Sequence, residues 1–246
     1  MSEKISKDDL ILLLGQEKSY VVRPIVFSCQ FGTYDLRKLV GKRLGKKIKI
    51  GKERFTVVKP TIIDLLKKAK RGPQIILPKD LGVIVSITGC SPGWKVVDAG
   101  TGSGFLSMFL AVIGCNIYTY EKKKEFYEIA KKNVKRFDLK NVTIKNKDIT
   151  KGIKERNVDL VTLDLKAPEK VVKHAFKALK PGGWIAVYSM HIEEVKNVNE
   201  ELLNHDFTNI LILESLHRQW QSIKEFTRPR TYMLAHTGFL TFARKM

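Results

Sequence analysis

The chain has 246 residues, 43% of them hydrophobic, so it can bury a substantial core and is not disordered as a whole. No apolar run approaches the roughly 20 residues that span a bilayer, and the charged start of the sequence does not resemble a signal peptide, which favours a cytoplasmic protein. Lysine and arginine number 45 against 25 acidic residues, and the net charge of +20 indicates a polyanionic partner such as nucleic acid. A lysine-rich thermophile surface usually adds glutamate as well, and here the acids do not keep pace.

The cysteines are three in number and scattered. Cys29, Cys90 and Cys115 form no CxxC pair and no cluster with histidine. This pattern predicts small core residues, with neither a disulfide framework nor a metal site.

Residues 1–65 are expected to form a small β-rich N-terminal domain, because short apolar or alternating runs are separated by glycines. The stretch from Gly41 to Lys52 carries six basic residues. A solvated hairpin edge, where lysines also discourage aggregation, and an RNA-contacting face are equally compatible with it. Two helices are expected between residues 62 and 90, and 66–94 is predicted to be a helical linker.

From Lys95 the predicted strands and helices alternate. Expected strands cover 95–100, 116–121, 142–145, 158–165, 184–189, 210–216 and 238–244, the last preceded by a loop; expected helices cover 103–113, 122–137, 169–179 and 191–204. Alternation of this kind predicts an α/β fold with a doubly wound, Rossmann-like and mostly parallel sheet over 95–246, whose last strand is antiparallel.

A glycine-rich turn, Asp98-Ala-Gly-Thr-Gly-Ser-Gly104, follows the first of these strands. Gly100, Gly102 and Gly104 let the backbone approach a ligand at the start of a helix. The spacing is not the G-x-G-x-x-G that seats a dinucleotide pyrophosphate. S-adenosylmethionine has no phosphate, and Asp98 can engage its cationic amino end.

Two more acids follow the second and third strands. Glu121 is placed to accept hydrogen bonds from the ribose hydroxyls of S-adenosylmethionine, and Asp148 is placed to accept one from the exocyclic amine of its adenine. Either acid alone is as compatible with an exposed strand end. Together with Asp98 they resemble the pattern of class I methyltransferases, which bind S-adenosylmethionine.

Asp164-Leu-Lys-Ala-Pro168 ends the fourth strand, and the carboxyl ends of strands hold the reacting groups in such sheets. A carboxylate there suits methylation of adenine at N1. Asp164 can accept from the N6 amine, orient the ring and offset the charge that develops on it. A plain helix-capping role is the alternative.

Longer segments resemble the TrmI family of tRNA (adenine-N1)-methyltransferases. They are Gln74-Ile-Ile-Leu-Pro-Lys-Asp80, the glycine turn, Asp164-Leu-x-x-Pro, and Arg228-Pro-Arg with His236-Thr-Gly-Phe-Leu-Thr-Phe-Ala-Arg244. The resemblance runs through almost the whole chain and is strongest to archaeal members. It implies S-adenosylmethionine as cofactor, tRNA as partner, a homotetramer, and 1-methyladenosine at position 58 of the T-loop, with position 57 also a target in some archaeal relatives.

The resemblance also implies roles for individual residues. Asp164 would be the catalytic acid, and His236 and Thr237 would lie near the target base, although a structural role for His236 is equally compatible. Leu77 stands where family members often carry tyrosine or histidine, so it can pack against a base but cannot donate a hydrogen bond. The implied cofactor contacts come from Gln74, Ser103, Gly104, Phe105, Leu106, Glu121 and Asp148.

Rival functions stay open at this point. A class I methyltransferase for a small molecule or protein would not need the basic charge or the N-terminal domain. A non-catalytic RNA-binding subunit would be expected to lose the glycine turn or the strand-end acids, and this chain keeps them. The glycine spacing disfavours an NAD-dependent oxidoreductase.

Overall fold

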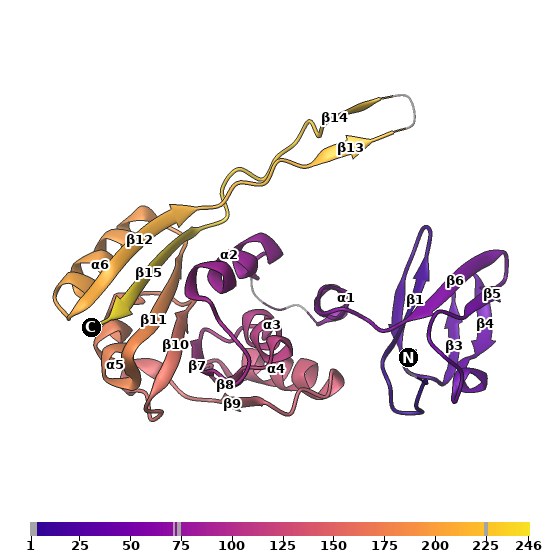
Figure 1. Cartoon of the computed structure of the whole chain (residues 1–246), viewed down its shortest axis with the longest axis horizontal. Helices are drawn as coiled ribbons and strands as arrows, with labels where there is room; N and C mark the ends of the chain where they lie inside the picture. Colours follow the sequence, from indigo (N-terminus) through magenta and orange to yellow (C-terminus); the bar gives the residue numbers. More distant parts are fainter. Residues whose placement is uncertain (1–3, 71, 73–74, 224–225) are drawn as a thin grey trace. The chain divides into compact units, whose positions relative to one another are not determined.

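The computed structural model describes residues 4–70, 72, 75–223 and 226–246, and the chain divides into two compact units, residues 1–69 and 70–246 (Figure 1). The segment 66–94, expected to be a linker, is therefore shared between the units. Helix α1 (Ile62–Lys68) belongs to the first, and helix α2 (Pro78–Thr88) belongs to the second. None of the described helices is long and apolar enough to cross a membrane.

The first unit is built around an antiparallel sheet in the order β2-β1-β6-β5. Alternation places Ile48 and Ile50 of β5 in the core and leaves Lys47 and Lys49 exposed on this edge strand. The strands are β1 (Ile11–Gly15), β2 (Tyr20–Val22), β3 (Val26–Cys29), β4 (Gly32–Asp35), β5 (Lys47–Ile50) and β6 (Glu53–Val58), with β3 and β4 forming a separate hairpin.

The second unit has a seven-stranded sheet in the order β12-β15-β11-β10-β7-β8-β9 (Figure 1). Strand β15 runs antiparallel between β11 and β12, and the pairs among β11, β10, β7, β8 and β9 are parallel. The predicted Rossmann-like class of fold is confirmed. The strands are β7 (Lys95–Ala99), β8 (Asn116–Tyr120), β9 (Val142–Lys145), β10 (Val158–Leu163), β11 (Leu179–Ser189), β12 (Phe207–Glu214) and β15 (Phe239–Lys245).

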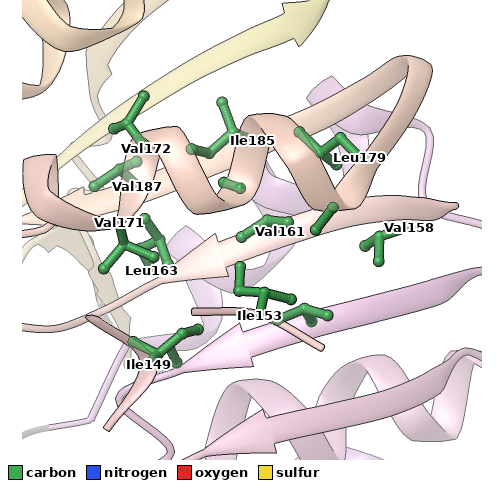
Figure 2. Packing of buried hydrophobic residues seen from close by; sticks show 14 of the residues in the cluster. Ile149, Ile153, Val158, Val161, Leu163, Val171, Val172, Leu179, Ile185 and Val187 are labelled. Atoms are coloured by element: carbon green, nitrogen blue, oxygen red, sulfur yellow. The ribbon is translucent and has the colours of Figure 1, made fainter. Parts of the chain in front are cut away.

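Helices cover both faces of this sheet, so the interior strand β7 is buried on both sides. Val97 and Ala99 belong to the same core as α5, and Figure 2 shows Val171 and Val172 of α5 over the strand residues of that core. Asp98, the residue between them on β7, faces α3, where it accepts a hydrogen bond from Ser107. The remaining helices are α3 (Phe105–Ile113), α4 (Lys124–Arg136), α5 (Glu169–Ala178) and α6 (Ile192–Leu203).

The segment between β12 and β15 departs from the expected loop, because it contains a hairpin of β13 (Trp220–Ser222) and β14 (Thr227–Pro229). We call residues 215–238 the arm (Figure 1). Its strands are short and lack apolar alternation, which explains why the sequence pattern did not reveal them. All three cysteines are free thiols, and the Sγ atoms of Cys90 and Cys115 lie 3.2 Å apart in the core.

Candidate active site

A pocket of about 450 Å³ opens at the carboxyl ends of β7, β8 and β10. The segments that follow these strands and β9 line it, because parallel strands present their carboxyl ends at one edge of the sheet. Nine of the residues predicted for the site line it: Asp98, Gly100, Gly102, Ser103, Phe105, Leu106, Glu121, Asp148 and Asp164. Gly104, which was also predicted, is the N-cap residue of α3 and is not among the lining residues.

Asp98 is a buried hydrogen-bond acceptor at the floor of the pocket. Sheet register places Thr119 of β8 and Thr162 of β10 directly beside it, and their hydroxyls donate to its carboxylate at 2.7 Å each. Ser107 of α3 donates a third hydrogen bond at 2.6 Å. Burial raises the pKa of Asp98, and the three hydroxyls oppose that rise. The residue therefore ties three elements together beneath the pocket.

The glycine turn uses its backbone amides within the protein. Gly100 N and Thr101 N donate to Tyr120 O, Gly104 N donates to Thr101 O, and Gly102 N donates to the Glu121 carboxylate at 3.0 Å. A phosphate-binding turn would instead leave such amides free for the ligand. This arrangement disfavours a dinucleotide and suits a ligand without phosphate.

Gly100 also fixes the distance between two neighbouring strand ends. Its φ is +85°, and an added Cβ atom would lie 1.7 Å from the carbonyl oxygen of Asp164. Asp164 N in turn donates to Ala99 O at 2.8 Å. The absence of a side chain at position 100 thus allows Asp164 to sit beside the turn.

Glu121 and Asp148 are each held with one face toward the pocket. The Glu121 oxygens accept from Gly102 N and, at 2.9 Å, from Lys123 N. Oδ1 of Asp148 accepts from the backbone and hydroxyl of Thr150, and these bonds lower the pKa of Asp148. Its Oδ2 has no hydrogen bond from any described residue, which leaves an ionised acceptor available to a ligand.

Ser103 is connected to a residue that the sequence pattern did not single out. Asn133 of α4 is buried, and its amide donates to Ser103 O and Lys70 O at 2.9 Å each and accepts from Lys70 N. Gly72 N donates to Ser103 Oγ at 2.8 Å. Asn133 therefore holds the chain at residue 70 against the glycine turn. A polar residue on the buried face of an amphipathic helix was the available signal.

Asp164 lies directly after β10, surrounded by protein except on the side of the pocket. Burial is the main cause that raises its pKa to about 7, and the carboxylates of Asp98, Glu194 and Glu121 raise it further. The group is therefore poised between its acid and its carboxylate near neutral pH. A nearby cation would favour the carboxylate.

Tyr188, Met190 and Glu194 also line the pocket, and the sequence analysis did not place them there. Tyr188 and Met190 stand at and just beyond the end of β11, and Glu194 is on the first turn of α6, where its carboxylate accepts from Met190 N at 3.1 Å. Their position beside Asp164 follows from the pairing of β10 with β11, which a single sequence does not reveal.

Three predicted substrate-binding residues, Leu77, His236 and Thr237, are not among the residues that line the pocket. Leu77 is the N-cap residue of α2, and the neighbouring Ile75 and Ile76 line the pocket in its place. Gln74 falls outside the described residues.

His236 is exposed at the base of the arm, where Nδ1 lies 2.8 Å from Glu214 and Nε2 lies 3.1 Å from Met190 O. Glu214 raises the pKa of His236. Thr237 is buried, accepts from Lys79 Nζ at 2.7 Å and donates to Asp80 at 3.2 Å, and its carbonyl accepts from the Tyr188 hydroxyl. His236 and Thr237 thus contact Met190 and Tyr188, which line the pocket.

The residues that line the pocket fit S-adenosylmethionine. A glycine turn that leaves room for a ligand, acceptors at Glu121 and Asp148, and apolar walls from Ile76, Phe105 and Leu106 match a ribose, an aminopurine ring and a thioether chain. Among the described residues no cluster of histidine, cysteine or acid could hold a metal ion.

Fold and pocket together define a class I S-adenosylmethionine-dependent methyltransferase. The family described as tRNA methyltransferase complex GCD14 subunit matches residues 63–226. The tRNA (adenine(57)-N(1)/adenine(58)-N(1))-methyltransferase TrmI of Methanocaldococcus jannaschii is 35% identical over 95% of this chain and 94% of its own length. The chain belongs to this family of TrmI and GCD14 proteins.

Solved structures agree with this assignment. A tRNA (m1A58) methyltransferase TrmI from Aquifex aeolicus is similar with a TM-score of 0.79 and 29% identity, covering 99% of both chains. A SAM-dependent O-methyltransferase from Thermotoga maritima is similar with a TM-score of 0.84 and 29% identity, covering 99% of this chain and 95% of that one. Both likenesses extend over the N-terminal unit as well as the sheet.

Proposed function

We propose that the chain transfers a methyl group from S-adenosylmethionine to N1 of an adenine in the T-loop of tRNA. Position 58 is the target, and position 57, which the name of the archaeal relative also gives, is the further position to be tested. The observation that carries the proposal is the place of Asp164, a carboxylate facing a pocket that already holds acceptors suited to the cofactor.

The residues proposed to bind the cofactor would each contact a different part of it. Glu121 would accept from the ribose hydroxyls, Asp148 Oδ2 from the adenine amine, and the negative field of Asp98 would favour the ammonium end. Phe105 and Leu106, at the start of α3, would pack against the cofactor, and Gly100, Gly102, Ser103 and Gly104 would approach it through the backbone. S-adenosylmethionine supplies an electrophilic methyl group on a positively charged sulfur.

Asp164 acts on the incoming base. Its carboxylate accepts a hydrogen bond from the N6 amine, which turns the N1 lone pair toward the methyl group. As the new N–C bond forms and the S–C bond breaks, positive charge moves onto the purine. Because Asp164 is largely surrounded by protein, solvent would screen its carboxylate only weakly from that charge, which the carboxylate stabilises. No proton needs to leave N1, because the ring nitrogen is unprotonated before it attacks.

Residues near the base of the arm would position the pocket wall rather than touch the methyl group. Thr237 holds Tyr188, and His236 holds the backbone at Met190; both Tyr188 and Met190 line the pocket beside Asp164. Leu77 would set the start of α2 beside Ile75 and Ile76. The base contact of the usual tyrosine or histidine at position 77 would be absent here.

A homotetramer is part of the proposal, and the arm supplies a surface for it. Exposed apolar side chains gather on the arm and on β12, where a partner copy would cover them. They include Leu211, Ile212, Leu216, Trp220, Ile223, Phe226, Tyr232, Met233 and Leu234.

Nucleoside mass spectrometry tests the reaction. Unmodified tRNA transcript incubated with the protein and S-adenosylmethionine is expected to yield 1-methyladenosine that maps to position 58, with or without 57. Asp164→Ala should lower the yield by orders of magnitude and change the cofactor Kd by only a few-fold. Ribose-methylated or unmethylated nucleosides would reject N1 methylation, and full turnover by Asp164→Ala would reject a role of its carboxylate in the reaction. A helix-capping role would not explain such a result, because Pro168 is the N-cap residue of α5 and no side chain caps it.

A further inference from the structure

A second cavity, of about 980 Å³, lies next to the cofactor pocket. The two share Tyr120, Lys122, Lys147 and Asp148 as a common wall. We call the second cavity the basic groove, because Lys122, Lys147, Lys151, Lys154, Arg156 and Lys177 line it. Asp148 is the one acid among its lining residues.

The charges of the groove are only partly offset within the protein, because Asp148, on which Lys122 and Lys151 act electrostatically, is the one acid that lines it. None of the five lysines forms an ion pair with any residue that the structure describes, and all five are exposed. They come from three separate parts of the chain, which the parallel sheet and α5 bring together. Gathering like charges in one groove costs self-repulsion, which a bound polyanion would relieve.

Arg156 gives the groove a fixed donor. Its Nη1 donates to Ile153 O at 2.6 Å and to Glu155 O at 2.8 Å, which holds the guanidinium in place. Its Nε and Nη2 have no partner among the described residues and are free to donate to an anion. A guanidinium held in this way suits paired contacts with phosphate oxygens.

We propose that the basic groove binds the phosphodiester backbone of the substrate RNA. This inference rests on the proposed function and assigns the electrostatic contact surface of the same site. The cofactor carries no phosphate, so the charges serve another ligand. Because the groove adjoins the pocket at Asp148, the RNA strand would run past the adenine end of the cofactor while its target base enters beside Asp164.

The test compares two triple variants with equal changes of charge. Lys151→Gln, Lys154→Gln and Lys177→Gln remove charges that line only the groove. Lys132→Gln, Lys135→Gln and Lys196→Gln remove three exposed charges from α4 and α6 that line neither cavity. Binding of tRNA transcript is measured from 50 to 200 mM salt, with the cofactor Kd measured alongside.

The groove triple is expected to weaken tRNA binding by about one to two orders of magnitude and to reduce the slope of log K against log salt by roughly 2 to 3. The control triple should change the tRNA affinity and the salt slope much less. The cofactor Kd should stay within about two-fold in both triple variants. Arg156→Lys keeps the charge but loses the paired geometry, and should weaken binding by a few-fold.

Equal effects of the two triples would overturn the inference, since only net charge would then matter. Saturable binding of inorganic tripolyphosphate that the groove triple abolishes, with tRNA binding unchanged, would overturn it in favour of a small-anion site. Methylation of tRNA by the unaltered protein is measured separately. If the unaltered protein does not methylate tRNA, the proposed function is rejected. If it does methylate tRNA but the two triple variants weaken tRNA binding equally, only the role of the basic groove is rejected.

Discussion

Asp98 and Asp164 are carboxylates at the same edge of the sheet, yet their surroundings suit them to different tasks. Three hydroxyls donate to Asp98 and fix it as a link between strands and α3. Asp164 receives no such hydrogen bond from the described residues and faces the pocket among other acids. The first is anchored by its hydrogen bonds and would act on a ligand through its charge, whereas the second is available to accept a hydrogen bond from a substrate.

The raised pKa of Asp164 predicts a pH dependence. If the carboxylate accepts from the base, kcat/KM should increase as pH rises through about 7 and level off above it. A sulfonium cation in the pocket favours the carboxylate, so the corresponding rise in kcat should lie at lower pH. Asp164→Asn should lack this limb. A flat profile in the unaltered protein would contradict the role of the carboxylate.

The same pKa shift has a consequence for stability. Because the folded-state pKa is above the usual value for aspartate, the native state holds a proton that the unfolded state releases, and this contribution to stability is lost as pH rises through about 7. Asp164→Asn should therefore raise Tm at pH 8 and leave it nearly unchanged at pH 4, as measured by thermal unfolding.

Gly100→Ala tests the close approach of the two strand ends. A Cβ atom at 1.7 Å from Asp164 O, on a residue with φ of +85°, forces the turn or the Asp164 segment to move. We expect a fall in kcat of at least about a hundredfold together with a weaker cofactor Kd. Gly41→Ala is the matched control, since its φ is +79° and no atom lies within 4 Å of its added Cβ. Normal activity of Gly100→Ala would show that the turn tolerates the shift.

At the scale of elements, α2 is joined to the base of the arm by a buried polar network. Lys79 Nζ donates to Asp80 Oδ1 at 2.7 Å, to Thr237 Oγ1 at 2.7 Å and to Ser215 O at 2.6 Å. Asp80 is fully buried, so its charge depends on these partners. The network fixes the backbone of Thr237, whose carbonyl oxygen accepts a hydrogen bond from the Tyr188 hydroxyl.

Lys79→Met should lower the free energy of unfolding by about 3 to 5 kcal/mol, because it leaves Asp80 buried without its cation. The double variant Lys79→Met with Asp80→Leu removes the stranded charge and should recover much of the loss. Denaturant unfolding of both variants measures the difference. A double variant less stable than Lys79→Met would show that a stranded charge on Asp80 is not the cause of the loss.

The sequence allowed much of the sheet to be predicted, because β7 and β10 are mostly apolar and are followed by glycine or acid, β8 leads directly into Glu121, and β9 alternates apolar with polar residues. It could not place Tyr188 and Glu194 beside Asp164, because that depends on which strands pair. Asn133 was hidden for a related reason, since its partners are distant in the chain. His236 and Thr237 could be named only by resemblance, and they contact neighbours of the pocket without lining it.

At the scale of the whole molecule, the arm carries the exposed apolar surface proposed for assembly. Trp220 and Ile223 are 61% and 45% exposed on it. Trp220→Glu with Ile223→Glu should dissociate the proposed tetramer into smaller species, seen by light scattering, because charges in an apolar interface lose solvation without gaining partners. Leu203→Glu, at a residue 68% exposed on α6, should leave the mass unchanged. Unchanged mass in the arm variant would remove the arm from the interface.

The two ends of the arm lie side by side, because Glu214 of β12, just before the arm, is paired with Phe239 of β15, just after it. A chain that leaves and re-enters a sheet at adjacent positions can gain or lose residues with only a small change in loop-closure entropy. Its length can therefore change over evolution without disturbing strand register. Relatives with the same catalytic sheet could thus differ in how many copies they join, simply by altering this insertion.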